Sequence, residues 1–420
     1  MMRRCGIVLL IALVGSAAGA EPLRIATFQA DVTPPLGAPL GFGAYGVARE
    51  LVDPLSARGL VILSDEQPVV LCAVDWIGLR NGGQQAFCEA LAAAAGTTTE
   101  RVNVHCLHQH DAPGVDFSSE ERLSAAGRGG TTCDVAASRQ AIAATARALG
   151  DAVRDRPRAV THLGIGKAKV ERVASNRRII GPDGKSKAVR WSATKNADVR
   201  AEPEGLIDPW LQLLSFWDGD TPIASVTYYA THPQSYYGKG GVSCDFPGLA
   251  RGLRESALPG VAHIHFNGAG GNVTAGKYND GNPTNRMALA ERLADGMQRA
   301  WLATVKASIV AGDVDYRAEA IELPSGGRLP AGRTFDVTAL RLGSAWIIHT
   351  PGELFVEYQL AAQRMRPAAT VCMAAYGDLA PGYIGTAKAY DEGGYEPGNS
   401  RTTPEAEQVL LDCFRRLLRD

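Results

Sequence analysis

The residues of this chain with the clearest chemical potential are histidines that follow apolar, strand-like runs. His105, His108 and His110 all fall within VNVHCLHQHDAPG. Alternate side chains of a strand share one face, so His108 and His110 are expected to project the same way from the strand end. Such a pair offers a metal one ligand and a neighbouring polar group. The same spacing is just as often a hydrogen-bonded surface feature, so the motif alone leaves both interpretations open.

Two further polar residues occupy similar positions. His232 follows the apolar run SVTYYAT, and Glu353 follows WIIHTPG. Glu353 has a second interpretation, because an acidic residue just before a helix stabilises the helix N-terminus through its dipole. Sites in α/β proteins gather at strand ends. Imidazole together with carboxylate suits Zn²⁺, which in catalytic sites keeps a position for water. The pattern therefore predicts a zinc site.

A glycine-rich stretch, HFNGAGGNVTAG, follows another apolar run. It lacks the GK[ST] ending of a phosphate-binding loop and the glycine spacing of a dinucleotide fingerprint. We interpret it as a loop with unusual backbone angles that brings main chain close to a substrate.

The elements that must position these residues alternate along the chain. Short β-branched and apolar runs bounded by turn residues predict strands, at 59–63, 69–74, 102–107, 211–216, 223–229, 262–266, 339–342, 345–349 and 370–375. Apolar residues spaced three or four apart predict helices around 290–301 and 406–417. Several strands follow each other too closely for a helical crossover. We expect an α/β or mixed α+β fold, with mixed sheets and helices packed outside them.

Composition limits the class of protein. Residues 1–20 combine a basic start, a short apolar run and small residues ending at Ala20, which is typical of a secretory signal peptide. No other segment is apolar over the roughly 20 residues of a membrane span. Acidic and basic residues nearly balance, with no basic stripe, which argues against nucleic acid as a partner. No linker, repeat or composition shift divides residues 21–420, so we expect one large domain or two fused lobes, exported to the periplasm or the medium.

Taken in order, the motifs resemble the catalytic domain of the neutral, non-lysosomal ceramidases. The matches follow the order of the family from about residue 30 to 400. The matching segments are ADVTPPLG (30–37), LGFG (40–43), HQHDAPG (108–114), SNR (175–177), LIDPWL through THPQS (206–235), GGNVTAG (270–276), TPGE (350–353), GYIGT (382–386) and GGYEP (393–397).

The resemblance implies a zinc hydrolase that cleaves an N-acyl amide bond in a small molecule or a lipid, with peripheral membrane contact in the lipid case. It implies four zinc ligands, namely His108, His232, Glu353 and Tyr383. Spacing alone does not single out Tyr383, which could equally be a pocket aromatic. The resemblance also gives His110, Arg177 and Tyr395 contacts with the scissile amide or the substrate head group, and it places Gly41 and Thr274 at the substrate.

Two departures from the family bear on the substrate. Thr274 stands where the family has a serine, and the chain resembles a short form without the family's C-terminal β-sandwich domain. Three alternatives therefore stay open. The protein could be a zinc esterase or amidase for a non-lipid substrate, or a non-catalytic exported binding protein on the same scaffold. Thr274 could also act as a nucleophile, although no activating base lies beside it in the sequence.

Overall fold

The same order of elements occurs three times along the chain in the computed structural model, which describes residues 21–419. Three antiparallel strands are followed by a helix, a strand parallel to the third, and a second helix. The predicted signal peptide lies outside the described residues. None of the helices within residues 21–419 is long and apolar enough to cross a bilayer.

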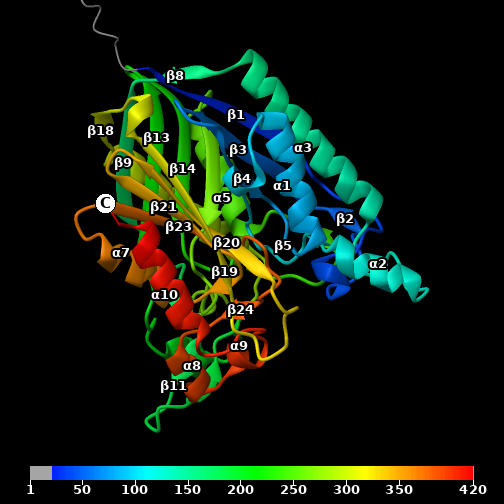
Figure 1. Cartoon of the computed structure of the whole chain (residues 1–420). Helices are drawn as coiled ribbons and strands as arrows, with labels where there is room; N and C mark the ends of the chain where they lie inside the picture. The colour runs from blue at the N-terminus through cyan, green and yellow to red at the C-terminus, as the bar shows by residue number, and fades with distance from the viewer. Residues whose placement is uncertain (1–20, 420) are drawn as a thin grey trace, which may run out of the picture.

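The first unit forms the sheet β6-β4-β3-β1-β8, with α1 and α3 on its outer face (Figure 1). Its strands are buried on both faces, because Val70 and Cys72 of β4 face the helices while Val69 and Leu71 face the centre of the molecule. That explains the unbroken apolar run of β4. The bounds are β1 Leu23–Asp31, β3 Ser56–Leu63, β4 Val69–Val74, α1 Gly82–Ala95, β6 Val102–Cys106, α2 Phe117–Ala125, α3 Val135–Asp155 and β8 Arg158–Val160.

The second unit forms the sheet β16-β14-β13-β9-β18 and carries α5 and α6 on its outer face. The bounds are β9 His162–Lys169, α4 Ala197–Ala201, β13 Trp210–Asp218, β14 Thr221–Tyr229, α5 Asp245–Ala257, β16 Ala262–Asn267, α6 Thr284–Leu302 and β18 Val305–Ser308. The third unit forms the sheet β19-β20-β21-β23 under α7 and α10. Its bounds are β19 Val314–Glu322, β20 Thr334–Leu342, β21 Ala345–His349, α7 Val356–Met365, β23 Thr370–Ala374 and α10 Ala406–Leu417.

The inner faces of the three sheets meet in one apolar core. Leu71 of β4, Phe216 of β13 and Ile347 of β21 belong to the same buried cluster, together with residues of the neighbouring strands. The predicted mixed sheets with helices outside them are confirmed, and all nine predicted strands are present. The strands β1, β8, β9, β18 and β19 were missed, and of the longer helices only α6 and α10 were predicted. In β19 most side chains stay partly or fully exposed, so it lacks a continuous apolar run.

Short two-residue ladders connect the loops that emerge from the sheets. β5 (Gly78–Leu79) pairs with β7 (Gly114–Val115), β10 (Ser175–Asn176) with β17 (Val273–Thr274), and β22 (Glu353–Leu354) with β24 (Tyr383–Ile384). The remaining short elements are β2 (Glu50–Leu51), β11 (Arg178–Ile180), β12 (Ser186–Val189), β15 (Gly241–Val242), α8 (Ala387–Glu392), α9 (Tyr395–Gly398) and three single 3₁₀ turns at 41–43, 99–101 and 311–313.

Candidate metal centre and surrounding pocket

The candidate site lies where the carboxyl ends of the three parallel strand pairs converge. The last paired residues are Val74 with Cys106, Tyr229 with Asn267, and His349 with Ala374. The chain leaves each sheet directly after these pairs. His108, His232 and Glu353 follow within a few residues, one from each unit. The three residues that follow strand ends in the sequence thus lie close together in space, because the three sheets pack around one core.

His108, His232 and Glu353 form a buried group whose ligand atoms all lie within 4.8 Å of one another. Glu353 Oε2 is 3.2 Å from Nε2 of His108 and 3.2 Å from Nε2 of His232. The opposite ring nitrogens are held by main chain, since His108 Nδ1 is 2.6 Å from the Ile77 carbonyl oxygen and His232 Nδ1 is 2.7 Å from that of Gly270. A carbonyl accepts only, so each Nδ1 carries the proton and each Nε2 presents a lone pair.

This arrangement fits a metal cation. Two imidazole lone pairs and a carboxylate oxygen face each other in a buried space. Burial lowers the pKa of His232 to about 4, which keeps that ring neutral near neutral pH. Neutral imidazoles and an ionised carboxylate are the protonation states that metal binding requires. The helix-dipole interpretation of Glu353 does not hold, because its carboxylate lies between the histidines and α7 begins three residues later, at Val356.

The backbone of His108 is constrained at this point. Its φ is 71°, which a non-glycine residue rarely adopts. Its N–H donates to the Trp76 carbonyl at 2.9 Å, and its ring stacks on Tyr376 with centroids 4.7 Å apart. These contacts stabilise the unusual conformation and fix the imidazole plane. Because β6 ends at Cys106, the loop conformation rather than strand alternation sets the direction of His108.

Tyr383 lies beside Glu353 because β22 and β24 pair in parallel with these two residues in register. Its ring centroid is 6.1 Å from that of His232. Burial raises the pKa of Tyr383 well above its ordinary value, and the Arg177 guanidinium, 4.9 Å from the ring centroid, opposes that rise. The structure therefore places the fourth predicted ligand next to the other three, with a cation beside it that favours the phenolate.

Arg177 is buried between two aromatic rings. Its guanidinium lies 4.9 Å from the centroid of Tyr383 and 5.2 Å from that of Tyr395. Nε donates to Glu396 at 2.7 Å, and one terminal nitrogen has no hydrogen-bond partner in the described part of the chain. Glu396 also accepts from Arg178 at 2.8 Å. One buried carboxylate thus positions Arg177 against both tyrosines.

His110 lies next to the metal group, with its ring centroid 5.2 Å from that of His108. The side-chain amide nitrogen of Gln234 contacts its Nε2, while the amide oxygen of Gln234 accepts from Ser192. Nε2 of His110 is therefore an acceptor, and Nδ1 carries the proton. Nδ1 is buried and has no partner within residues 21–419. The ring stacks on Tyr45 with centroids 4.9 Å apart.

Above this group lies a cavity of about 300 Å³. Gly41 and Tyr395 line it together with His108, His110, Glu353 and Tyr383. Gly41 has a φ of 59°, and a Cβ there would collide with the Tyr45 ring that supports His110. Of the predicted site residues, His232, Arg177 and Thr274 do not line this cavity. The Thr274 hydroxyl is buried and donates to the Arg190 carbonyl at 3.2 Å.

The glycine-rich loop differs from its predicted backbone. None of Gly268, Gly270, Gly271 and Gly276 has a positive φ, so the expectation of unusual angles is wrong. These residues are small because main chain packs against them: a Cβ at Gly271 would lie 2.8 Å from the Leu354 carbonyl oxygen. The loop therefore approaches the Glu353 segment and supplies the carbonyl that orients His232. The loop contacts the metal group through His232 and through the backbone of residues 353–354.

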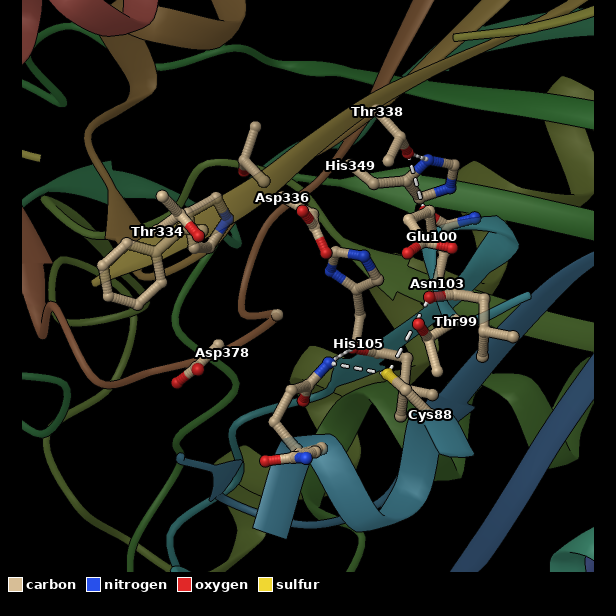
Figure 2. A pocket seen from close by; sticks show the side chains of 18 of the residues that line it. Cys88, Thr99, Glu100, Asn103, His105, Thr334, Asp336, Thr338, His349 and Asp378 are labelled. Carbon is tan, nitrogen blue, oxygen red and sulfur yellow. Dashed lines mark hydrogen bonds between the residues drawn. The ribbon is translucent and has the colours of Figure 1, made fainter. Parts of the chain in front are cut away.

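His105 does not join the metal group. It lines a second cavity of about 300 Å³ (Figure 2), with its ring centroid 5.3 Å from that of His349. Burial lowers the pKa of His105 to about 4. Figure 2 shows His349 linked to Thr338, at 3.0 Å, and Thr338 donates to Asn103 at 2.7 Å. Asn103, Thr338 and Nδ1 of His349 thus form a hydrogen-bonded chain, while Nε2 of His349 is buried without a partner within residues 21–419.

Several residues of the site carry no sequence signal that we recognised. Tyr376 stacks on His108, Gln234 fixes the tautomer of His110, and Glu396 holds Arg177. Gln234 lies two residues after His232 and Glu396 directly follows Tyr395, so proximity to a predicted site residue was the available signal. Tyr376 follows the β23 strand end, which is the position that His108 occupies after β6.

Comparison with known proteins identifies the fold. No family model and no curated protein sequence matches this chain. Its fold is that of the neutral ceramidases. The neutral ceramidase from Pseudomonas aeruginosa superposes with a TM-score of 0.72 at 16% identity, covering 94% of this chain and 74% of that chain. A ceramidase complexed with C2 gives 0.71 at 15% identity, covering 94% and 75%. At such identities the likeness establishes the fold, and the chemistry must be argued from the residues.

Proposed function

We propose that this protein is an exported zinc-dependent hydrolase that cleaves the amide bond of an N-acyl small molecule or lipid. The observation that carries the proposal is the buried group of His108, His232 and Glu353, in which two oriented imidazole lone pairs and a carboxylate oxygen face one point. Tyr383, in register beside Glu353, is the proposed fourth ligand. The shared fold of the neutral ceramidases supports the assignment to hydrolases.

When bound, zinc would supply Lewis-acid polarisation of the substrate carbonyl and a water of lowered pKa. In the overall reaction, water adds to the carbonyl carbon, the C–N bond breaks, and the amine leaves with a proton. The protein side chains hold the carbonyl in position. Ile77 and Gly270 contribute through their carbonyls, which lock the tautomer and plane of the two ligand imidazoles.

His110 and Tyr395 are the proposed donors to the oxygen that becomes negatively charged. The Gln234 contact leaves the proton of His110 on Nδ1, and that N–H has no hydrogen-bond partner within residues 21–419 that a substrate would have to displace. Burial lowers the pKa of His110 well below its ordinary value, so the ring is a neutral donor. A preorganised donor to an oxyanion contributes about 2.7–4 kcal/mol to the activation free energy.

Arg177 has a positioning role in this proposal. Its charge between the rings of Tyr383 and Tyr395 favours a fixed orientation of both phenols. Gly41 leaves room for Tyr45 to support His110. Thr274 is not assigned a chemical step, because its hydroxyl donates to a backbone carbonyl and lies outside the cavity lining.

The test combines metal analysis with turnover of a fluorogenic N-acyl amide. The wild-type protein should contain one zinc and lose activity on chelation. His108→Ala should lose zinc and turnover together. His110→Ala should keep zinc and lose turnover by roughly a hundredfold or more. His162→Ala, on β9 and outside the site, is the matched histidine control and should keep both.

Two results would refute the proposal. One is a zinc-replete wild-type protein that binds no metal, and the other is zinc loss in His110→Ala, which would reverse the roles of the two histidines. Export is tested separately, by N-terminal sequencing of the protein recovered outside the cytoplasm, with cleavage expected near Ala20.

A further inference from the structure

Two arginines line the cavity above the metal group. Arg80 follows β5, and Arg401 comes from the segment after α9. The Arg80 guanidinium lies over the ring of Phe42, 4.0 Å from its centroid. Phe42 has a φ of 57°, and its ring fills the space where Gly78 and Gly114 carry no side chain. Arg401 is anchored by one donation to the Ala380 carbonyl at 3.1 Å.

Neither arginine forms an ion pair with any carboxylate of residues 21–419. Nε of the half-buried Arg80 is enclosed and has no hydrogen-bond partner there. The carboxylates whose charge acts on Arg80 are those of Glu353, Asp116 and Asp378, and all three are bound by other groups. Glu353 lies between the two ligand histidines. Asp116 caps α2 and accepts from Asn81 at 2.8 Å, and Asp378 is paired with Arg333. This contrasts with Arg177, which forms an ion pair with the buried Glu396.

The electrostatic setting favours a negatively charged guest. Burial, and next to it the charge of Arg401, lower the pKa of Arg80, so two cations repel each other across the cavity wall. Burying an unpaired cation is unfavourable, and the attraction of an anion between the two arginines would offset both the desolvation cost and the repulsion. Guanidinium groups are well suited to this role because they present paired donors to an oxyanion.

We propose that Arg80 and Arg401 bind an anionic group of the substrate, so that the preferred substrate carries a carboxylate close to the scissile amide. The proposal rests on the proposed amide hydrolysis and specifies its substrate class. The carboxylate belongs either to the amine part, as in an N-acyl amino acid, or to the acyl part, as in an N-succinyl amine. A cavity of about 300 Å³ is at the small end for ligand sites, which suits the polar end of such a compound.

The experiment uses the zinc-loaded protein and three substrates that share one phenethyl group: N-acetyl-phenylalanine, N-acetyl-phenethylamine and N-succinyl-phenethylamine. At least one of the two carboxylates should exceed the neutral amide in kcat/KM by roughly tenfold to a hundredfold, the usual contribution of a charged hydrogen bond. The better carboxylate shows which part of the substrate carries the charge. The proposal is overturned if the neutral amide is preferred over both.

Variants assign the preference to the arginines rather than to the metal. Arg80→Met and Arg401→Met should each bring the ratio of carboxylate to neutral substrate towards one. Arg147→Met, at an exposed position on α3, is the matched control and should keep the wild-type ratio. If Arg80→Met fails to fold, Arg401→Met at its exposed position gives the same information. An unchanged ratio in Arg401→Met, or in a folded Arg80→Met, would overturn the proposal.

Calorimetric titration with the same three compounds separates this proposal from the proposed hydrolysis. If the zinc-loaded protein cleaves none of them but binds a carboxylate at least tenfold more tightly than the neutral amide, and Arg80→Met or Arg401→Met removes that difference, the anion site stands and the hydrolase assignment falls. If cleavage occurs without any preference for the carboxylates, the hydrolase assignment stands and the anion site falls.

Discussion

Replacing Gly41 by alanine tests how strictly the cavity wall holds His110. A Cβ at Gly41 would lie 2.5 Å from Cε2 and 3.1 Å from Cγ of Tyr45, and nearer still to Cδ2. Carbon atoms in contact are about 3.5–4.0 Å apart, so the Tyr45 ring must withdraw by about 1 Å or more. That ring stacks on His110 with centroids 4.9 Å apart. A displacement of about 1 Å near the reacting atoms reduces turnover by roughly a hundredfold.

Gly46→Ala is the matched control, because Gly46 lies in the same loop, has a φ of 79°, and has nothing within 4 Å of an added Cβ. Both variants should lose about 1–2 kcal/mol of stability from the positive φ. Only Gly41→Ala should lose turnover, with its zinc content intact. Equal kcat values for the two variants, measured with the fluorogenic amide, would refute the idea that Tyr45 positions His110.

Two further predictions concern stability. Asp75 is fully buried and accepts from Arg251 at 2.7 and 2.9 Å, so Asp75→Asn should reduce the free energy of unfolding by about 3–5 kcal/mol. The control Asp295→Asn, at an exposed ion pair, should reduce it by about 1 kcal/mol or less. Equal losses for the two variants in urea unfolding would contradict this. Burial lowers the pKa of His265 to about 3 from an ordinary value near 6.5. Between these values the unfolded chain binds the extra proton, so this histidine should remove about 1.4 kcal/mol of stability for each pH unit of acidification. His265→Gln should show a shallower loss of stability between pH 6 and pH 4, and an unchanged slope would disprove the assignment.

Prediction from the sequence worked best where burial leaves a local pattern. The run PVVLCAV reads as a strand because both faces of β4 are covered, and the three-to-four spacing at 406–417 reads as a helix because one face of α10 is buried. β19 was missed because its partly exposed side chains break the alternation. The threefold recurrence of the units was also invisible in the sequence. The recurrence lies in the order and pairing of the elements, whereas the side chains of the three sheets differ.

The site was predicted in part by strand-end histidines and in part by resemblance. Strand-end position identified His108, His232 and Glu353, and the structure brings these three together. Tyr383 came from the resemblance alone, since the β22–β24 pairing that places it beside Glu353 joins segments 30 residues apart. Arg80 and Arg401 were not identified, because an arginine in a loop carries no local sign that it lacks a partner.

The sequence by itself determined nine of the strands, the helices α6 and α10 and the polar residues at strand ends, because these leave a pattern among neighbours within a few positions along the chain. Only the tertiary structure decided which polar residues meet. His105 and His108 lie in one motif, yet β6 directs His105 into the second cavity, and the positive φ of His108 turns its ring towards Glu353. The physical reason is that these side chains meet only when the three sheets pack around a common core. That packing depends on contacts between residues far apart in the sequence, which no local sequence pattern specifies.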